Sequence, residues 1–198
     1  MNKLRTQHYQ IHRRVVDDTT LKIIRELNND TWIPGIQNLH EAQYFQHTML
    51  KENSVELYQV YHQLTDRLCQ LVKHFNDQTY KFDISRGIHE EDGLCILKYS
   101  IGHQFGWHVD DGPQGHEAPE PTKFGDGSTC RKLTFSVGLN SSRDYEGGLI
   151  EFNNDGNGHT INHSDMFIWP GYMPHRVTPV TKGVRYVLIG YVHGTIWR

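Results

Sequence analysis

The spacing of apolar residues changes at residue 79, and this change constrains the fold more than any other feature of the sequence. From there on, short segments alternate apolar with polar side chains or are apolar throughout, as strands do. Gly, Asn, Asp and Pro separate these segments, which are residues 80–84, 94–99, 133–139, 149–152, 166–169 and 184–192. Short strands in series with few helices between them favour an antiparallel sandwich or barrel over βαβ units.

Helical spacing dominates the chain before residue 79. Residues 17–27 have the pattern of a short amphipathic helix. A longer helix is predicted to follow Asn53, which with Glu56 makes a capping-box-like start. Its apolar stripe comprises Leu57, Val60, Tyr61, Leu64, Leu68, Leu71, Val72 and Phe75. We therefore expect one domain over 1–198, mainly β with N-terminal helices, in which 1–78 is mainly helical support and 79–198 is the β core.

Composition excludes several classes of protein. The 198 residues contain no apolar run long enough to cross a bilayer, and residues 1–15 are polar and basic, unlike a secretory signal. The formal charge of −3 without a Lys/Arg stripe argues against a nucleic-acid binder. The three cysteines, Cys69, Cys95 and Cys130, are odd in number and widely spaced. This usage predicts reduced thiols and a cytoplasmic protein.

Residues 111–130 do not fit the strand pattern. They contain seven Gly and Pro residues and show no apolar periodicity. Structureless loops of about 20 residues are uncommon inside a compact domain, and those that occur are often functional lids. We therefore consider two interpretations of this segment, a lid over a site and a floppy insertion.

Histidine and aspartate occur twice at the spacing His-x-Asp, which on a strand places both side chains on one face. The pairs are His108 with Asp110 and His163 with Asp165. With 14 His and 13 Asp in the chain, chance alone predicts about one such pair, so the spacing is weak evidence. The first pair follows a strand and opens the 111–130 loop, whereas the second has the pattern of a turn whose Asp165 bonds backbone.

His175 is the natural third ligand for the first pair. It lies beside a strand near the end of the chain. Two His and one Asp from different strands form a facial triad that leaves metal positions open, as in non-haem Fe(II) oxygenases. The same ligands also suit zinc. The ligand set alone therefore leaves an iron oxygenase and a zinc hydrolase open.

Arg185 favours the oxygenase, because it is a lone charge on an otherwise apolar strand over 184–192. A guanidinium on a buried strand face needs an anionic partner. We expect residues 181–183 to form a turn that places Arg185 and His175 on neighbouring antiparallel strands, so that a small dicarboxylate bridges the metal and the guanidinium. Two alternatives are a surface Arg at a strand end and an anchor at Lys182 instead.

Four ordered motifs give the chain a resemblance to a known family over about residues 94–193. They are Leu97-Lys98-Tyr99 with Gly102 leading to His108-Val109-Asp110; Arg131-Lys132-Leu133-Thr134 through Leu139-Asn140; Asp144-Tyr145-Glu146-Gly147-Gly148; and the segment from His175 to Arg185. Together they resemble the prolyl 4-hydroxylase-like branch of the Fe(II)/2-oxoglutarate-dependent dioxygenase superfamily. The last two motifs are especially similar to PKHD-type hydroxylases.

The resemblance implies a double-stranded β-helix, the cupin-like jelly roll, braced by α-helices. It implies Fe(II) bound by His108, Asp110 and His175, and 2-oxoglutarate bound through its distal carboxylate by Arg185, with Tyr99 as a further contact. The family couples the decarboxylation of 2-oxoglutarate to succinate with the hydroxylation of a C–H bond by O2, and ascorbate can accompany the reaction. Peptidyl proline is the first choice of substrate, ahead of a free amino acid or a small metabolite.

Two positions distinguish this chain within that resemblance. Some prolyl hydroxylases carry a Tyr that helps to hold the cosubstrate where this chain has Gly138. Asp110 stands where the related halogenases have a small residue, which favours hydroxylation. The alternatives from other classes are a zinc hydrolase, which leaves Arg185 unexplained, and a non-catalytic jelly-roll binding module, which leaves the whole triad unexplained.

Overall fold

The computed structural model describes residues 9–21, 33–34, 43–46, 55–85, 87–88, 93–111 and 129–196, with backbone only at 33–34, 43–46 and 55–58. The described strands form a seven-stranded sheet, a four-stranded sheet and a two-stranded sheet. Every pairing between named strands is antiparallel. The prediction of an antiparallel β architecture is therefore confirmed.

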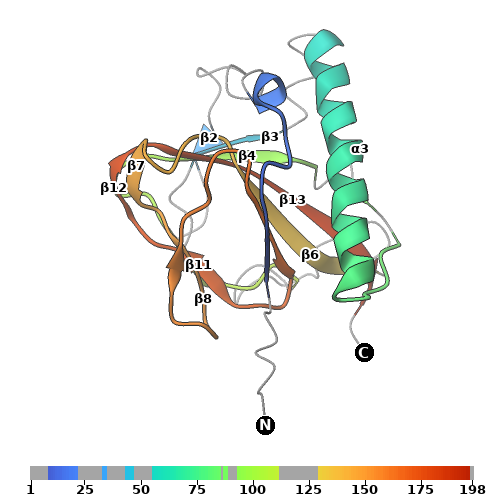
Figure 1. Cartoon of the computed structure of the whole chain (residues 1–198). Coiled ribbons are helices and arrows are strands. Elements are labelled where there is room, and N and C mark those ends of the chain that lie inside the picture. The colour runs from blue at the N-terminus through green and yellow to red at the C-terminus, as the bar shows by residue number, and fades with distance from the viewer. Residues whose placement is uncertain are drawn as a thin grey trace.

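The seven-stranded sheet has the order β1-β10-β6-β13-β4-β3-β2. Its central strands β6 and β13 are the longest, and they pair along most of their length. The bounds are β1 Gln10–His12, β2 Ile33–Pro34, β3 Gln43–Gln46, β4 Cys95–Tyr99, β6 Thr129–Gly138, β10 Met166–Pro170 and β13 Arg185–Thr195. Figure 1 shows β13 and β6 crossing the middle of the molecule.

The four-stranded sheet has the order β5-β11-β8-β9 and supplies the opposite layer. A third pair, β12 with β7, joins the layers at one end, as seen at the left of Figure 1. The bounds are β5 Phe105–His108, β7 Tyr145–Gly147, β8 Ile150–Phe152, β9 Gly158–His159, β11 His175–Val177 and β12 Val180–Gly183.

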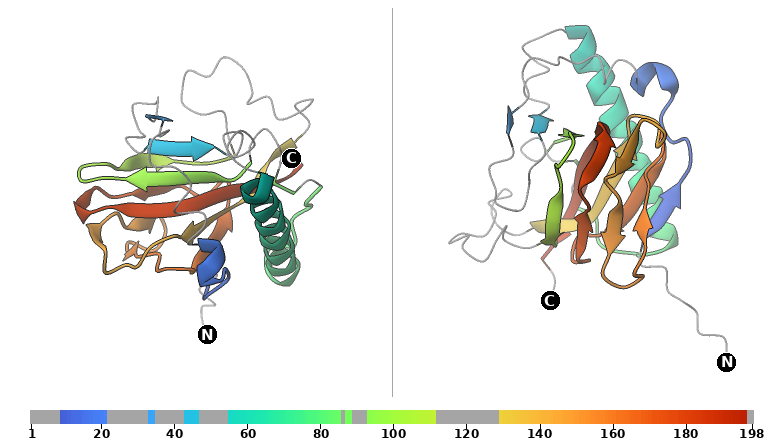
Figure 2. Two further views of the ribbon diagram at one scale, coloured as in Figure 1. Left: turned by 90° about the horizontal axis from the view of Figure 1, so that it is seen from above. Right: turned by 90° about the vertical axis from the view of Figure 1, so that its left-hand side faces the viewer.

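Helix α3, Val55–Gln78, covers the outer face of the large sheet. Its Leu64, Leu68 and Val72 are buried in one apolar cluster with alternate residues of β6 and β13, which include Phe135 and Leu188. Both views in Figure 2 show α3 outside the layers of strands. Burial of this stripe confirms the long helix that the spacing predicts, and it leaves the other face of the sheet for the interior.

On β6 and β13, the side chains that alternate with those under α3 point inward, toward the small sheet. There they meet a second cluster of buried residues. This second cluster contains Tyr99, Phe152, Trp169, Val177 and Val187. Strand alternation therefore divides the large sheet into an apolar face under α3 and an inner face that carries polar groups among aromatic ones. The inner face of the large sheet is where the candidate site lies.

The predicted strand over 80–84 is wrong. Residues 81–85 belong to no strand. Lys81 has a φ of 55°, outside the strand region, and the side chain of Asn76, near the end of α3, binds the backbone of Phe82. The Asn76 side chain donates to the Phe82 carbonyl at 2.8 Å and accepts from the Phe82 N–H at 2.9 Å. Tyr80 and Phe82 pack against the helix-side cluster.

The segment before residue 79 contains more than helical support, because β1 pairs with β10 at one edge of the large sheet and β3 with β4 toward the other. The spacing of apolar residues did not predict these short strands. The predicted helix over 17–27 is described only over 18–21, where Asp17 caps it by accepting from the Thr20 N–H at 2.9 Å. The capping pair's Asn53 and residues 112–128 of the predicted lid lie outside the described residues.

Candidate active site

Two of the three predicted metal ligands are paired neighbours in the small sheet. His108 is the last residue of β5 and His175 the first of β11, and the register places them directly opposite one another. Their ring centroids lie 4.2 Å apart. Chain positions almost seventy residues apart are thus brought together by the pairing of two very short strands.

Asp110 completes the group just beyond the end of β5. Its backbone N–H donates to the Gly171 carbonyl at 2.7 Å, which fixes the turn after His108. The carboxylate oxygens lie 3.6 Å from His108 Nε2 and 3.5 Å from His175 Nε2. One ligand atom from each of the three residues lies within 4.8 Å of the others. Among the described residues, this group is the one cluster of His, Cys, Asp and Glu with such a spacing.

Backbone carbonyls orient both imidazoles. His108 Nδ1 lies 2.8 Å from the Gly106 carbonyl oxygen, and His175 Nδ1 lies 3.0 Å from the Met173 carbonyl oxygen. A carbonyl oxygen accepts only from a protonated Nδ1, so the neutral imidazole keeps the lone pair on Nε2 for a metal. A hydrogen bond from the other ring nitrogen to a carbonyl is the usual second contact of a metal-binding His. The donor set of two imidazole nitrogens and a carboxylate therefore fits Fe(II).

Two donors from the large sheet hold Asp110 Oδ2, the oxygen that also faces His175 Nε2. Thr134 Oγ1 on β6 donates to Asp110 Oδ2 at 2.7 Å, and Trp169 Nε1 on β10 donates to it at 3.3 Å. Burial raises the pKa of the Asp110 carboxyl, but the adjacent imidazoles, Arg131 and the Thr134 hydrogen bond together hold it below its usual value. The carboxylate is thus anchored by the opposite layer.

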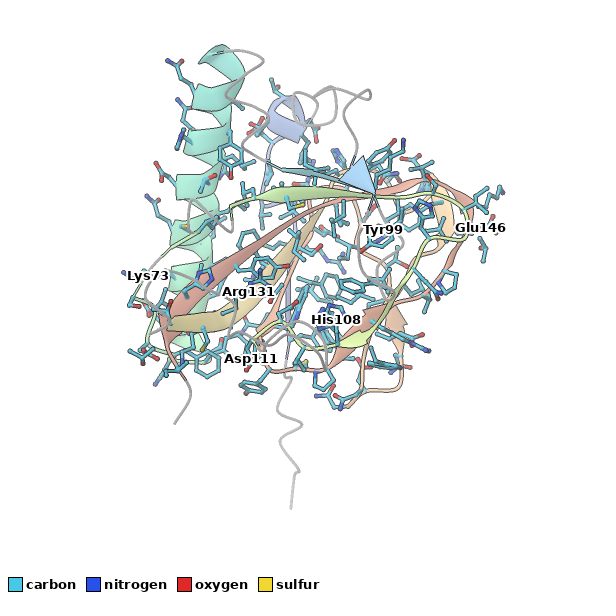
Figure 3. The ribbon with its side chains drawn as sticks, turned by 180° about the vertical axis from the view of Figure 1, so that it is seen from behind. Lys73, Tyr99, His108, Asp111, Arg131 and Glu146 are labelled. Carbon is cyan, nitrogen blue, oxygen red and sulfur yellow. The ribbon has the colours of Figure 1, made fainter. Side chains whose placement is uncertain are left out.

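Arg185 and Tyr99 face each other on neighbouring strands of the large sheet. The register of β13 and β4 pairs the two residues, and the guanidinium carbon lies 4.9 Å from the centre of the Tyr99 ring. Both side chains are buried. Burial raises the pKa of Tyr99 to about 12, against the opposing effect of Arg185. In Figure 3, Tyr99 and His108 both lie within the layered strands, away from Lys73 on α3.

The Arg185 guanidinium has two nitrogen donors that make no hydrogen bond. Its Nε and Nη1 atoms are buried without a hydrogen-bond partner. A buried donor with no acceptor costs about 1–3 kcal/mol, and more for a charged group. This arrangement is typical of an anion-binding site, and a carboxylate bound through both of its oxygens is the ligand that best matches a guanidinium.

The predicted relation between His175 and Arg185 is wrong. The two residues lie on β11 and β13, which belong to different sheets. Residues 180–183 form strand β12 and not only a turn. Gly183 ends this strand with φ of 71°, and a Cβ there would lie 2.0 Å from the Asp144 carbonyl oxygen, so a residue without a side chain carries the chain from one layer to the other.

The structure also shows the surroundings of the two rival residues, Lys182 and His163. The Lys182 ammonium is exposed and pairs with Glu146 at 2.8 Å, at the far end from α3 in Figure 3, which favours Arg185 over Lys182 as the anchor. His163 and Asp165 flank a turn at Ser164, as expected, and Asp165 accepts from the Arg14 N–H at 3.3 Å.

Sequence reasoning missed the groups that support the predicted residues. Thr134 and Trp169 were placed in strands but given no role. The signal in the sequence was polar residues, Thr134 and Ser136, at alternate positions of an apolar strand. Tyr145, on which Arg185 acts, lies inside the motif Asp144-Tyr145-Glu146-Gly147-Gly148, but the sequence pattern gives it no role.

The described fold is thus a jelly roll whose interior holds a two-histidine, one-carboxylate group and a buried arginine. The profile of the family described as the 2OG-Fe(II) oxygenase superfamily matches residues 94–193, about half of the chain. The chain belongs to this superfamily. The family assignment and its cofactors, Fe(II) with 2-oxoglutarate and hence O2, are therefore confirmed, and ascorbate stays a prediction.

Proteins with similar sequences are PKHD-type hydroxylases. One from Gloeothece citriformis is 28% identical over 136 residues, covering 68% of this chain and 57% of its own. Another, from Idiomarina loihiensis, is 29% identical over 105 residues, covering 52% of this chain and 43% of its own. The chain spans about half the length of the curated relatives that it matches.

Solved structures confirm the jelly-roll fold. The viral collagen prolyl hydroxylase of Paramecium bursaria Chlorella virus-1, in complex with 2-oxoglutarate, superposes with a TM-score of 0.66 at 11% identity, covering 98% of this chain and 100% of that one. A Pseudomonas putida prolyl 4-hydroxylase gives 0.66 at 16% identity, covering 96% and 94%. Within the described ranges, no helix has the length and apolarity needed to span a membrane.

Proposed function

We propose that this protein is an Fe(II)- and 2-oxoglutarate-dependent hydroxylase. His108, Asp110 and His175 bind the iron through two imidazole nitrogens and a carboxylate oxygen. Arg185 binds the distal carboxylate of 2-oxoglutarate, and Tyr99 is a further contact for it. The catalytic unit is a single domain over 1–198, with the site in the β portion that follows residue 79.

One observation carries this proposal, namely that a candidate metal group and a buried, incompletely partnered guanidinium share the interior of one jelly roll. Tyr99 lies close enough to both groups that the charge of Arg185 lowers the pKa of its hydroxyl and the charge of Asp110 raises it. A zinc hydrolase would use the triad but needs no buried Arg185. A binding module without catalysis would need neither the triad nor the two donors that hold Asp110.

Iron with 2-oxoglutarate supplies the oxidising chemistry of the family, in which a C–H bond is hydroxylated while 2-oxoglutarate yields succinate and CO2. The residues of this chain bind and orient. Thr134 and Trp169 hold one oxygen of Asp110, and the Gly106 and Met173 carbonyls fix the imidazole tautomers. Asp110 and His175 are buried, which strengthens the electrostatic interactions at these two residues.

A peptidyl residue is the proposed substrate, with proline first. The support comes from structural neighbours, which are prolyl hydroxylases, one of them from Trichoplax adhaerens in complex with a peptide fragment. The surface beside the triad is also suitable. Trp107 and Val109 flank His108, and Tyr172 follows the Gly171 carbonyl that holds Asp110; their exposed fractions are 45%, 37% and 46%. Exposed apolar side chains so close to a site suit a partly apolar chain segment.

The alternative within the same chemistry is a free amino acid or a small metabolite. A screen separates the two: the Fe(II) protein is supplied with 2-oxoglutarate and oxygen together with proline-containing peptides, free amino acids or small carboxylic acids. The proposal predicts that a peptide gains the mass of one oxygen atom and that succinate forms in equal amount. Oxygen transfer to a free amino acid alone would overturn the peptide assignment. The cytoplasmic location and the absence of nucleic-acid partners stay predictions.

A further inference from the structure

Tyr145 lies against the guanidinium of Arg185 from a strand outside the large sheet. It is the first residue of β7 and is 5% exposed. Burial raises the pKa of its hydroxyl, whereas a hydrogen bond from Arg185 and the charge of that residue act in the opposite direction. Both effects place the Tyr145 hydroxyl beside the guanidinium, which Tyr99 approaches from β4.

The proton of the Tyr145 hydroxyl is directed at a backbone carbonyl. Tyr145 Oη donates to the Ile161 carbonyl at 3.0 Å, across a buried contact. A phenol that donates to a carbonyl can offer only its lone pairs to another neighbour, so it acts on Arg185 as an acceptor. Tyr145 thus holds part of the guanidinium in place without competing for an anion.

The Ile161 carbonyl is held in position by a close approach of two chain segments. Residue 163 forms an isolated parallel bridge with Gly138, and the Ser164 N–H donates to the Gly138 carbonyl at 2.9 Å. A Cβ at Gly138 would lie only 2.2 Å from the Asn162 carbonyl oxygen. The missing side chain at Gly138 is therefore what lets residues 161–163 reach the inside of the site.

A second glycine keeps Tyr145 and Arg185 in contact. Gly148 has φ of 58°, and a Cβ there would lie 2.9 Å from Arg185 Cδ and 3.6 Å from Tyr145 Cε2. A side chain at this position would press on the stem of Arg185 and on the edge of the tyrosine ring. Two glycines thus shape the space in which the hydroxyl meets the guanidinium.

From these contacts we propose that Tyr145 is a positioning residue for Arg185, and that it makes the site selective for ligands with a second carboxylate. The inference rests on the proposed function, because the ligand is 2-oxoglutarate. The hydroxyl orients the guanidinium so that the partnerless Nε and Nη1 stay available to the distal carboxylate. In this chain, the orienting group arises from β7 and the 161–163 segment, where some prolyl hydroxylases use a Tyr at the position of Gly138.

The test compares two 2-oxo acids on Tyr145→Phe, a change that removes the hydroxyl and retains the ring. The probes are 2-oxoglutarate and pyruvate, which lacks the distal carboxylate, each titrated without oxygen into the Fe(II) protein. Because Tyr145 acts on the ligand only through Arg185, we expect 2-oxoglutarate to bind about 5- to 10-fold more weakly, less than the loss of a direct hydrogen bond to a charged group would cause. Binding of pyruvate and of Fe(II) should not change.

Tyr80→Phe is the matched control. The Tyr80 hydroxyl also donates to a backbone carbonyl, that of Ile168 at 3.3 Å, but it belongs to the helix-side cluster. This variant should bind both 2-oxo acids as the wild type does, with a similar thermal stability to Tyr145→Phe.

Two outcomes would overturn the positioning role. If wild-type protein binds 2-oxoglutarate and Tyr145→Phe binds it equally well, Tyr145 does not position Arg185. If both 2-oxo acids weaken together, the residue has only a structural role. If wild-type Fe(II) protein does not bind 2-oxoglutarate at all, the proposed function fails first and the inference fails with it.

Discussion

Arg185 and Tyr99 occupy opposed positions on β13 and β4, with the guanidinium carbon 4.9 Å from the centre of the aromatic ring. The face of a tyrosine ring attracts a cation, and the Tyr99 hydroxyl also interacts with the same guanidinium as a hydrogen-bond acceptor. Because both residues are buried, the charge of Arg185 acts in surroundings of low dielectric constant. This geometry makes the guanidinium a strong receptor for one carboxylate and leads to the first prediction.

Arg185→Ala should weaken 2-oxoglutarate binding by about 10- to 150-fold, the value of one charge-assisted hydrogen bond of roughly 1.5–3 kcal/mol. Arg185→Lys should weaken it less, since lysine retains the charge but lacks the planar fork. Iron binding should be retained in both variants. Titration of 2-oxoglutarate into the anaerobic Fe(II) protein measures the effect.

Lys182→Ala is the control for that experiment. The Lys182 ammonium is exposed and pairs with Glu146 on the surface, so its removal should leave 2-oxoglutarate affinity unchanged. A loss of affinity in Lys182→Ala together with unchanged affinity in Arg185→Ala would show that the carboxylate binds elsewhere.

The second prediction concerns the iron ligands. His108→Ala and Asp110→Ala should abolish stoichiometric Fe(II) binding and 2-oxoglutarate-dependent succinate formation, because each removes one of three protein ligands. Metal content after gel filtration and succinate assays measure the two effects. His163→Ala removes the other histidine found at His-x-Asp spacing and should change neither quantity. Loss of iron in His163→Ala would mean that the wrong pair was chosen.

The third prediction tests the support of Asp110 by the large sheet. Thr134→Val removes the donor at 2.7 Å from Asp110 Oδ2 while retaining the shape of the side chain. The carboxylate then loses a hydrogen bond worth about 1.5–3 kcal/mol, so Fe(II) affinity should fall by about 10- to 100-fold, as for other outer-sphere partners of metal ligands. Thr134→Ser retains the hydroxyl and should bind iron nearly as the wild type does. Equal losses in both variants would point to packing instead of the hydrogen bond.

The fourth prediction is a pH dependence of stability that depends on Asp83. This carboxylate accepts from the Thr195 N–H at 2.8 Å and from the Thr195 hydroxyl, and it lies 3.4 Å from the ammonium of the buried Lys132. The Thr195 hydrogen bonds are the main reason that the pKa of Asp83 lies below its usual value.

Because the folded-state pKa is lowered, the stabilisation is present above the unfolded-state pKa of about 3.9 and is lost as the pH falls through the lowered folded-state value. Asp83→Asn should therefore lower the free energy of unfolding at pH 7, by about 1 kcal/mol because half of the side chain is exposed and solvent screens it. Urea unfolding should show this difference shrinking in strong acid. If the difference in the free energy of unfolding between wild type and Asp83→Asn were the same at pH 7 and in strong acid, the charge of Asp83 would not be its cause.

Alternation along long strands made much of the site predictable. The lone charge on residues 184–192 marked Arg185 as an interior group, and the structure buries it on the face that the alternation indicates. The stripe on α3 was equally direct, because one helix face must find an apolar sheet. Local pattern was sufficient wherever an element was long enough to show its own period.

Arrangement between distant strands was not predictable in this way. Strands β5, β7, β11 and β12 have only three or four residues each, too few to show a period. Whether His175 and Arg185 share a sheet depends on Gly183 and its contact with the Asp144 carbonyl, a feature of tertiary structure. The role of Thr134 likewise depends on a partner, Asp110, that lies 24 positions away along the chain.

The most direct test of the central claim is anaerobic titration of 2-oxoglutarate into the wild-type protein with and without Fe(II), followed by admission of oxygen and assay of succinate. The account predicts one iron per chain, tight 2-oxoglutarate binding only when iron is bound, and succinate after oxygen is admitted. It also predicts that Asp110→Ala loses all three properties. Tight 2-oxoglutarate binding and succinate formation in Asp110→Ala at the wild-type level, or no 2-oxoglutarate binding to the iron-loaded wild type, would contradict it.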